Sequence, residues 1–570
     1  MVSFFVKIKI RLHVLILYKE KNMKLSKVLS IAAIACLGLV STAAAEIKLS
    51  KAQMEEATEV YFDRCAGCHG MLRKGALGPS LEPEKMKAMG TDTLKYIIHE
   101  GTPGGMPEWG KSGELSAAQT DLMAKYIQVE APQPPEKSMA DMKKSHKVLI
   151  PVKDRPKAPE AKNWKDYFAV ILRDVGQIAI VDGVTKDVVS VVPSGFATHI
   201  TRTGASGRYM YVIGRDGKAS MIDLWMKVPK NVAEIRTCND ARAIDTSKHK
   251  DYLDKYAVVG CYWPPSIVTL DADTLDPLKI VSTASYTYDE NVFTREARVA
   301  AIIASHDKPE WVINIKETGQ VWLYDYSNIK NPKITMVEAE RFLHDGGWDL
   351  SKRYFMTAAN ARDIISVIDT KEGKLVANIP SQGNKPHPGR GVNVDHPKYG
   401  PIWGTGHIGS NDIVFIGTDP VNHPKNAWKV VKKTALPGEG GGNLFVKGHP
   451  NSPYIFADRP VNPDRKLQTQ IYVLDKISLE VVKTLPIDEK YLKPAKTADG
   501  KEIQARGPVH FEFNADGSEV WTSIWGNKLA ASPILIYDSK TLKLKKVIDD
   551  KRLITPTGKF NVTNTMNDTY

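Results

Sequence analysis

The spacing of hydrophobic and polar residues changes twice along the chain. A mostly apolar run covers residues 28–40 near the N-terminus. Further on, apolar residues follow a helical period and indicate helices over 51–64, 91–100 and 116–129. Beyond residue 162 this period disappears, and short alternating segments are separated by Gly, Asn and Asp, which indicates β-strands. We therefore expect a small helical region followed by a larger β region.

The β region is built from a tandem repeat. Each unit has an apolar strand, a turn, a strand that ends in Asp followed three residues later by Thr or Ser, and a further strand. The eight units place the end of that strand at Asp182, Asp223, Asp271, Asp325, Asp369, Gly417, Asp475 and Asp538, at spacings of 41 to 63 residues. Repeats of this length made of short antiparallel strands predict an eight-bladed β-propeller with one four-stranded blade per repeat. A β-sandwich is the alternative, and eight tandem copies argue against it.

The N-terminus has the composition of an export signal. A basic segment at 23–27 precedes the apolar run, and Ala43-Ala44-Ala45 offers an Ala-x-Ala cleavage site before Glu46. We interpret residues 1–45 as a secretory signal peptide. Residues 1–22 add a hydrophobic and basic stretch that a signal does not need, so we take Met23 as the true start of translation. An uncleaved anchor is the alternative.

Removing the signal changes the charge of the chain. The 570 residues carry a formal net charge of +13, and the predicted mature chain keeps 71 basic and 64 acidic residues, a net charge near +7. No basic run is interleaved with aromatic residues, so nucleic acid is not an expected ligand. The mature chain also has no stretch long and apolar enough to span a membrane. The weak basicity is compatible with an acidic redox partner.

Cys65-Ala66-Gly67-Cys68-His69 is the attachment sequence for a c-type haem. Two thiols one helical turn apart add to the two vinyl groups on one edge of the porphyrin, and His69 then lies under the iron as an axial ligand. A redox disulfide and half of a zinc site are the alternatives for a Cys-x-x-Cys pair. The adjoining His69 and the export signal favour haem c.

The second axial ligand is expected on a loop. Met106 lies in a Gly- and Pro-rich stretch, GTPGGMPEW, where a methionine cannot serve as a core residue on a helix face. A rigid loop facing the haem is where a cytochrome c places its thioether ligand. Met86, Met89 and Met123 are the alternatives. With both axial positions filled, this module transfers electrons and has no place for a substrate.

These motifs define the expected domains. A cytochrome c domain covers 46–132, a Pro-, Lys- and Glu-rich linker covers 133–162, and the propeller covers 163–570. Cys36 leaves with the signal, so Cys238 and Cys261 remain outside the haem motif. They are either buried thiols or a disulfide between neighbouring strands, and we favour buried thiols.

Histidines and arginines mark a site on the propeller. His199, His344 and His387 each come just before the innermost strand of a predicted blade, which places their loops at one rim of the central channel. Arginines also lie near strand starts or turns, at Arg173, Arg202, Arg215, Arg242 and Arg390. Guanidinium groups facing a channel favour a ligand with carboxylates, because the planar fork binds them in a bidentate manner.

From Cys65 onward the chain resembles the cytochrome cd1 nitrite reductase family. The most specific segments are GTPGGMPEWG, SGRYMYVIGRDGK, RVAAIIASH, FLHDGGWD, HPGRG and TPTGKFNVTNTMNDTY. The resemblance implies a homodimer that holds one haem c and one haem d1 and reduces nitrite to nitric oxide and water in the periplasm during denitrification. It also implies electron donors that are small c-type cytochromes or cupredoxins, and side activity towards oxygen or hydroxylamine.

The resemblance also implies roles for individual residues. His199 corresponds to the proximal ligand of the d1 iron, while His344 and His387 correspond to the distal pair that supplies protons to nitrite. The haem d1 periphery is expected to contact Arg173, Arg202, Arg215, Arg242, Tyr262, Arg390 and His510. Two charged histidines side by side are expected to titrate as a coupled pair.

Two departures from the family pattern stand out. Only 19 residues separate Glu46 from Cys65; they contain no histidine, and Tyr61 is too close to Cys65 to reach haem d1 from an N-terminal arm. We therefore expect His69 and Met106 to bind the haem c iron in the resting state, with no tyrosine on the d1 iron. His510 stands where the family usually has glutamine, which leaves room for a paralogue.

Two rival functions follow. One is a dihydro-haem d1 dehydrogenase-like enzyme that makes the cofactor. The other is a non-catalytic haem carrier or electron-transfer protein, which would not need the two distal histidines. The His344 and His387 pair favours the reductase.

Overall fold

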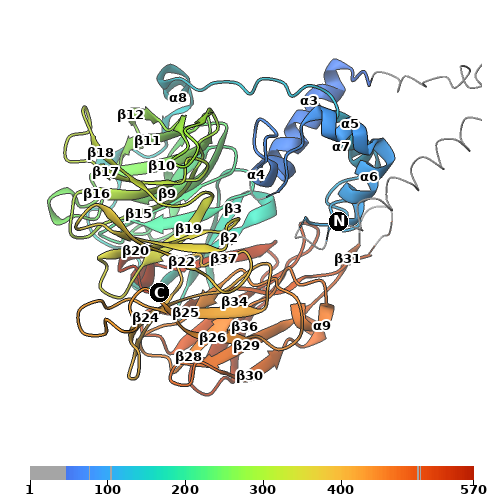
Figure 1. Ribbon diagram of the computed structural model, residues 1–570. Helices are drawn as coiled ribbons and strands as arrows, with labels where there is room; N and C mark the ends of the chain where they lie inside the picture. The colour runs from blue at the N-terminus through green and yellow to red at the C-terminus, as the bar shows by residue number, and fades with distance from the viewer. Residues whose placement is uncertain (1–46, 76–77, 103–105, 497–499, 501) are drawn as a thin grey trace, which may run out of the picture. The chain divides into compact units, whose positions relative to one another are not determined.

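The computed structural model describes residues 47–570 except 76–77, 103–105, 497–499 and 501 (Figure 1). The predicted signal peptide, with Cys36 and both possible starts, lies outside the described residues. Among the helices that are described, none has the length and apolar character needed to cross a membrane.

The helical region contains the three predicted helices and one more. The first is interrupted: α3 (Lys51–Val60) passes into a wider π-turn, η1 (Tyr61–Cys65), and then α4 (Ala66–His69). The other predicted helices are α6 (Thr91–Glu100) and α7 (Ala117–Tyr126), and the additional one is α5 (Pro83–Met89). Arg73 lies between the rings of Tyr61 and Tyr126, its guanidinium carbon 5.3 and 4.1 Å from their centroids. Tyr61 is thus a core residue beside the haem c motif.

The segment predicted as a linker carries helix α8, strand β1 and the short 3-10 helix η2 (Val152–Asp154). Helix α8 (Met139–Ser145) begins with a capping box in which Ser138 and Asp141 satisfy each other's backbone N–H groups. Strand β1 (Lys147–Val148) then pairs with the outer strand of a propeller blade, Lys147 opposite Glu234. Met142 of α8 is buried among residues of that blade and the next. The prolines and charged residues of this segment predicted an interdomain connection. They gave no sign of the contacts by which α8 and β1 attach it to the propeller.

Eight antiparallel sheets of four or five strands are present among the described residues, which confirms the eight-bladed propeller (Figure 1). From inside to outside, the first four blades are β37 (Pro556–Asn561), β2 (Tyr167–Leu172), β3 (Gln177–Asp182), β4 (Val188–Pro193); β5 (Ile200–Thr203), β6 (Tyr209–Ile213), β7 (Lys218–Asp223), β8 (Lys230–Arg236), β1; β9 (Asp240–Thr246), β10 (Tyr256–Trp263), β11 (Ser266–Asp271), β12 (Pro277–Ser282); and β15 (Val299–Ala304), β16 (Glu310–Ile315), β17 (Gln320–Asp325), β18 (Lys333–Glu338).

The other four blades follow the same order. They are β19 (Leu343–Trp348), β20 (Tyr354–Ala359), β21 (Ile364–Asp369), β22 (Lys374–Pro380); β23 (Val392–His396), β24 (Gly400–Thr405), β25 (Asp412–Gly417), β26 (Val430–Ala435); β27 (Val446–Lys447), β28 (Tyr454–Ala457), β29 (Gln470–Asp475), β30 (Val481–Pro486); and β33 (Gly507–Phe513), β34 (Glu519–Trp525), β35 (Ile534–Asp538), β36 (Leu544–Ile548). Short hairpins β13 (Ser285–Tyr286) with β14 (Phe293–Thr294) and β31 (Ala495–Lys496) with β32 (Glu502–Ile503), and helices α9 (Arg465–Gln468) and α10 (Val562–Met566), lie between or after them.

The ring closes by pairing residues from the two ends of the propeller segment. β37 is the innermost strand of the blade whose other strands, β2 to β4, come first in the propeller, and Phe168 pairs with Asn561. Closing the ring removes two open sheet edges. The second and third strands of most blades are buried, and the hydrophobic cores lie between adjacent blades.

The repeated Asp has a local structural role. Asp182 Oδ1 accepts hydrogen bonds from the backbone N–H groups of Val184 and Thr185, at 2.7 and 3.1 Å. Asp271, Asp369, Asp475 and Asp538 do the same in their own blades. Such bonds stabilise the tight turn into the outermost strand. The repeat that revealed the fold is therefore a turn signal.

Cys238 and Cys261 form a disulfide, with Cα atoms 6.1 Å apart. The preference for buried thiols was therefore wrong. Cys261 lies on β10, opposite Ala241 of β9, and Cys238 lies just before β9. The pairing of these two strands brings the sulfur atoms together, and a separation of 23 residues in the sequence does not reveal that pairing.

Candidate functional site

A cavity of about 310 Å³ opens at the inner strands of the propeller. Seven of the predicted site residues line it: Arg173, His199, Arg202, Arg242, His387, Arg390 and His510. They come from five of the blades, and apolar residues such as Ile244, Ile302, Phe445 and Val509 fill the wall between them. Ring closure thus assembles one site from residues nearly 340 positions apart.

His199 is held in the form that binds a metal. It comes directly before β5, and its Nδ1 lies 2.9 Å from the backbone carbonyl oxygen of Arg242. Since a carbonyl only accepts, Nδ1 carries the hydrogen and the Nε2 lone pair stays free. Burial, together with the charges of Arg242 and Arg215, holds the pKa of His199 well below its usual value. The ring is neutral, as an iron ligand must be.

Some N–H groups of the arginines in the cavity wall have no hydrogen-bond partner. The Nε groups of Arg202 and Arg242 are buried without a hydrogen-bond partner. Burial and the neighbouring Arg390 lower the pKa of Arg202 to about 10. Arg390 directs its Nη1 to Gly346 O and its Nη2 to Ile302 O, both at 2.9 Å. Buried unpaired guanidinium N–H groups are costly unless a ligand supplies acceptors, so this wall fits an anionic, carboxylate-bearing ligand.

A second group lies at the start of β19. His344 and His387 have ring centroids 5.1 Å apart, and the Asp345 carboxylate lies between them. Its Oδ1 is 3.0 Å from His344 Nδ1, and its Oδ2 is 3.3 Å from His387 Nε2. Burial lowers the pKa of His344 to about 3, although Asp345 opposes this shift. His344 is therefore neutral, which differs from the expected pair of charged histidines.

His510 is fixed between two aromatic rings. Its ring centroid is 4.6 Å from that of Phe445 and 5.2 Å from that of Phe560. The residue has φ +53° at a β-bulge, a conformation that turns its side chain away from the regular register. His510 Nδ1 accepts the N–H of Lys559 at 3.3 Å, and burial holds its pKa well below the usual value. A neutral ring with this tautomer leaves Nε2–H as a donor for a ligand.

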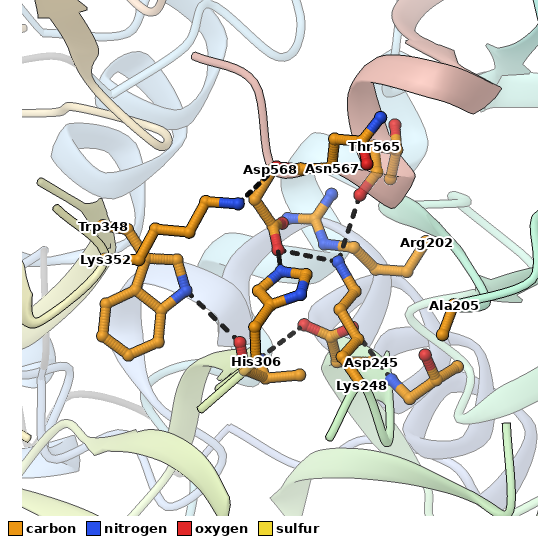
Figure 2. A network of polar contacts seen from close by, with 12 residues as sticks. Arg202, Ala205, Asp245, Lys248, His306, Trp348, Lys352, Thr565, Asn567 and Asp568 are labelled. Atoms are coloured by element: carbon orange, nitrogen blue, oxygen red, sulfur yellow. Dashed lines mark hydrogen bonds and ion pairs between the residues drawn. The ribbon is translucent and has the colours of Figure 1, made fainter. Parts of the chain in front are cut away.

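Thr565, Asp568, Thr569 and Tyr570 form another part of the wall. Figure 2 shows polar contacts around Asp568 in this C-terminal segment. The Asp568 carboxylate accepts from Lys248 Nζ at 2.8 Å, His306 Nε2 at 2.7 Å and the Tyr570 hydroxyl at 2.9 Å. Lys352 Nζ donates to Asn567 O at 2.9 Å. Side chains from several blades thus hold this segment against the cavity. Sequence reasoning missed it, although the block TPTGKFNVTNTMNDTY contains it.

Arg215 and Tyr262 are not among the residues that line the cavity. Arg215 forms two 2.8 Å hydrogen bonds to the Asp240 carboxylate and lies 5.0 Å from the Tyr262 ring centroid. A Cβ at Gly67 of the haem c motif would lie 3.1 Å from Arg215 Nη1. The structure therefore places Arg215 beside the haem c motif, and its contact with haem d1, like that of Tyr262, stays a prediction.

The haem c residues fit covalent attachment. Cys65 and Cys68 are not joined in a disulfide. His69 Nδ1 lies 2.7 Å from Pro79 O, which leaves Nε2 for the iron, and burial lowers the pKa of the ring. Met106 lies half-buried in a loop, part of which (103–105) is outside the described residues. The loop position of Met106 agrees with the predicted ligand.

The alternative methionines lie on helices. Met86 in α5 and Met123 in α7 are buried, and Met89 at the end of α5 is 41% exposed. Buried methionines on helix faces commonly pack in the core. Met106 remains the predicted ligand.

Comparison with known proteins decides the family. The profile described as "Cytochrome D1 heme domain" matches residues 162–565, and that described as "Cytochrome C oxidase, cbb3-type, subunit III" matches residues 52–127. A "Nitrite reductase" of Stutzerimonas stutzeri is 46% identical over 560 residues, covering 95% of this chain and 98% of the relative. The chain belongs to the cytochrome cd1 nitrite reductase family.

More distant relatives share the architecture. A "Dihydro-heme d1 dehydrogenase" of Pseudomonas aeruginosa is 26% identical over 508 residues, covering 89% of this chain and 93% of the relative. The solved structure "Dihydro-heme d1 dehydrogenase NirN in complex with DHE" is 25% identical with a TM-score of 0.65, covering 90% of this chain and 99% of that one. The propeller fold of the cytochrome cd1 chain is thus shared with a protein of a different activity.

As a cytochrome cd1 family member, the chain has one haem c and one haem d1. The residues present fit both groups. Cys65, Cys68 and His69 provide the attachment sequence and an imidazole with a free Nε2. At the cavity, His199 provides a second such imidazole, and the unpaired Nε–H groups of Arg202 and Arg242 are donors that fit the carboxylates of haem d1.

Sequence reasoning did not single out Asp345, which lies within 3.3 Å of both His344 and His387. Asp345 lies next to His344 in FLHDGGWD, one of the segments that carry the family resemblance. Its contact with His387, 42 positions further on, depends on the packing of two neighbouring blades. No local pattern in the sequence signals that contact.

Proposed function

We propose that this chain is a periplasmic dissimilatory nitrite reductase that forms nitric oxide in denitrification. Nitrite takes one electron and two protons and yields nitric oxide and water. Electrons enter at haem c from a small c-type cytochrome or a cupredoxin and pass to haem d1. The secretory signal predicted at 1–45 supports the periplasmic location, and the family resemblance supports a homodimer.

The observation that carries this proposal is the His344, Asp345 and His387 group beside the cavity. Haem d1, when bound, supplies the iron at which nitrite accepts the electron. His199 would hold that iron through Nε2, because its Nδ1 hydrogen is committed to Arg242 O. His387 and Asp345 both line the cavity, so the His387 ring is placed to act on an anion that enters. A cofactor carrier has no need of such a group.

The guanidinium groups of the cavity wall also favour binding of the anionic substrate. Arg202, Arg242 and Arg390 give the cavity a positive potential, which attracts both the carboxylates of haem d1 and the nitrite anion. The apolar wall between them excludes water and strengthens these charge interactions. Reduction of oxygen or hydroxylamine is a proposed side activity, since neither needs the same proton delivery to an anion.

A dihydro-haem d1 dehydrogenase is the second candidate, favoured by the 25% identical solved structure of that activity. The identities of 46% and 26% to the two curated relatives support the reductase instead. A purified chain that oxidises a dihydro-haem d1 and does not reduce nitrite would establish the second candidate.

The test is single-turnover nitrite reduction by the fully reduced protein with matched haem d1 content. His344→Ala and His387→Ala are each expected to slow the reaction about a hundred- to ten-thousandfold, the usual contribution of general acid catalysis. Reduction of haem c by the donor is expected to stay nearly unchanged. The double variant is expected to lose less than the product of the single losses.

A matched control is His423→Ala. That ring is partly exposed and bonds to Asp419 on an outer turn. It is expected to keep the wild-type rate. Wild-type rates in both single variants at the site would remove His344 and His387 from the mechanism.

A further inference from the structure

A carboxylate of the propeller holds the segment that follows the haem c motif. Glu296 is 5% exposed and lies just before β15. Its Oε1 accepts the backbone N–H of Met71, and its Oε2 accepts that of Leu72 at 3.1 Å. Both N–H groups lie within three residues of His69, the predicted axial ligand. One side chain of the propeller is therefore bonded directly to the main chain beside the haem c motif.

Gly70 allows the carboxylate to come this close. Its φ is +83°, and a Cβ on it would lie 3.0 Å from Glu296 Oε2 and 3.2 Å from Oε1. A side chain at this position would displace the carboxylate, and the backbone conformation favours glycine. The Tyr61 hydroxyl donates to Gly70 O at 2.7 Å. The turn after His69 is therefore bonded to the core of its own domain and packed against Glu296.

Arg298 contacts the same motif from the same propeller segment. Its Nη1 donates to Ala66 O at 3.4 Å, and its Nε donates to Glu317 Oε1 at 2.7 Å. The Arg298 side chain is 0% exposed, so its charge depends on the Glu317 partner. Burial raises the pKa of Glu296 to about 7, whereas Arg298 and the two N–H donors oppose this rise. Above that pH, Glu296 is an ionised acceptor, and its hydrogen bonds are of the stronger, charge-assisted kind.

The spacing between two haems matters for electron transfer, because the rate falls exponentially with the distance between donor and acceptor. Domains joined by a linker move relative to each other unless specific contacts oppose the motion. The contacts of Glu296 are with backbone groups, which follow the main chain of the haem c motif more closely than a flexible side chain does. They are therefore suited to keep haem c at a constant distance from the cavity.

We propose that Glu296 is a positioning residue for electron transfer between the two haems: it fastens the segment after the haem c motif to the propeller and keeps haem c at a fixed distance from the cavity. This assignment rests on the proposed route of electrons from haem c to haem d1. One electron is lost at haem c and one is gained at haem d1, and Glu296 exchanges no proton in the step. Glu296 acts on the rate through geometry alone.

Intramolecular electron transfer tests this role without nitrite. A pulse of reducing radicals delivers one electron to haem c of the oxidised protein with both haems bound, at pH 8, and absorbance follows its arrival at haem d1. Glu296→Ala loses both hydrogen bonds and is expected to slow the transfer about ten- to a hundredfold, the loss that small misplacements cause. Glu296→Gln keeps one acceptor oxygen, and its rate is expected to lie between those of Glu296→Ala and wild type. A wild-type rate in Glu296→Ala would overturn the proposal.

Gly70→Ala separates position from charge. This variant keeps the Glu296 carboxylate, whose charge also affects the haem c potential, but crowds it with a Cβ. The transfer is expected to slow here too, and the double variant with Glu296→Ala is expected to lose less than the product of the single losses, because both changes disturb one contact. Gly90→Ala is the matched control: Gly90 has φ +79°, and no atom of the described residues lies within 4 Å of a Cβ placed there. Equal losses in Glu296→Ala and Glu296→Gln, with a wild-type rate in Gly70→Ala, would assign the effect to charge and refute the positioning role.

Hydrogen exchange gives a readout that is independent of electron transfer. The amides of Met71 and Leu72 are expected to exchange faster in Glu296→Ala than in wild type, since a hydrogen-bonded amide exchanges through local opening. Glu310→Gln is the control, because Glu310 is a buried glutamate of the same blade at the start of β16. It is expected to leave exchange and electron transfer unchanged. Unchanged exchange at both amides in Glu296→Ala would overturn the proposal.

The same measurements distinguish this role from the proposed function. Absence of nitrite reduction in a protein whose haems still exchange electrons, with the expected losses in the variants, would refute the proposed function and leave the role of Glu296 in place.

Discussion

Replacing Asp568 by Asn removes the charge that holds one wall of the cofactor cavity. The carboxylate accepts hydrogen bonds from Lys248 and His306 (Figure 2), and from the Tyr570 hydroxyl. The Lys248 side chain is 0% exposed and that of Asp568 is 4% exposed. Breaking a buried ion pair by removing one partner costs about 3–5 kcal/mol, because the other charge remains buried. Asparagine keeps one acceptor oxygen, so we expect a loss near the lower end, about 3 kcal/mol.

The assay is urea unfolding of the full chain, followed by tryptophan fluorescence, with haem d1 content measured in parallel. A loss of this size lowers the unfolding midpoint, and the weakened wall is expected to lower haem d1 retention as well. Lys248→Met is expected to cost a similar amount. The double variant is expected to lose less than the sum, since the two residues share one interaction.

The pH dependence of the unfolding free energy provides an independent check. Burial alone would raise the pKa of Asp568, but Lys248 and His306 hold it well below its usual value. The stabilisation is therefore present above the unfolded-state pKa of about 3.9 and is lost as the pH falls below it. The difference between wild type and Asp568→Asn is expected to shrink below about pH 4.

Lys352→Met is the control for a contact at the edge of the same segment. Lys352 donates to Asn567 O from an exposed position, so its loss is expected to cost less than about 1 kcal/mol. An Asp568→Asn protein that unfolds within about 0.5 kcal/mol of wild type, the usual range for surface substitutions, would refute the anchoring role.

Three further predictions concern the cofactors and the disulfide. Met106→His is expected to keep the covalent haem c and lower its potential, because imidazole favours ferric iron more than thioether does; an unchanged near-infrared thioether-to-iron band would exclude Met106 as ligand. His199→Ala is expected to keep haem c and lose most haem d1, so full d1 content with unaltered spectra would contradict its assignment. Replacing Cys238 and Cys261 by Ala opens a loop that joins residues 23 apart, and the loss is expected to be about 3 kcal/mol by urea unfolding. Added reductant should destabilise wild type and leave that double variant unchanged.

The repeat made the propeller predictable. Asp182 and its equivalents terminate the third strand of their blades, and Gly417, where the Asp is missing, still ends β25. The local turn motif therefore marks the position of each blade in the sequence. The pairing of Cys261 with the strand beyond Cys238 depends on which strands become neighbours, and turn signals do not carry that information.

The candidate site was predictable only where it is local. His199 and His387 stand beside inner strands and line the cavity as expected. The Asp345 contact with His387 and the Asp568 contact with Lys248 join residues 42 and 320 positions apart. The guanidinium of Arg215 bonds to Asp240, and its expected contact with haem d1 stays a prediction. Blade packing, which no single segment encodes, decided these contacts.

Closure of the ring by its last strand has a consequence for the order of biogenesis. The cavity wall includes residues from Arg173 to Tyr570, and the blade that seals the ring lacks its inner strand until residues 556–561 are in place. A ribosome-bound chain that lacks this strand has no complete pocket. The haem d1 pocket is therefore complete only once this strand has paired, whereas Cys65 and Cys68 lie some five hundred residues earlier in the chain. The haem c attachment sequence does not depend on that last strand.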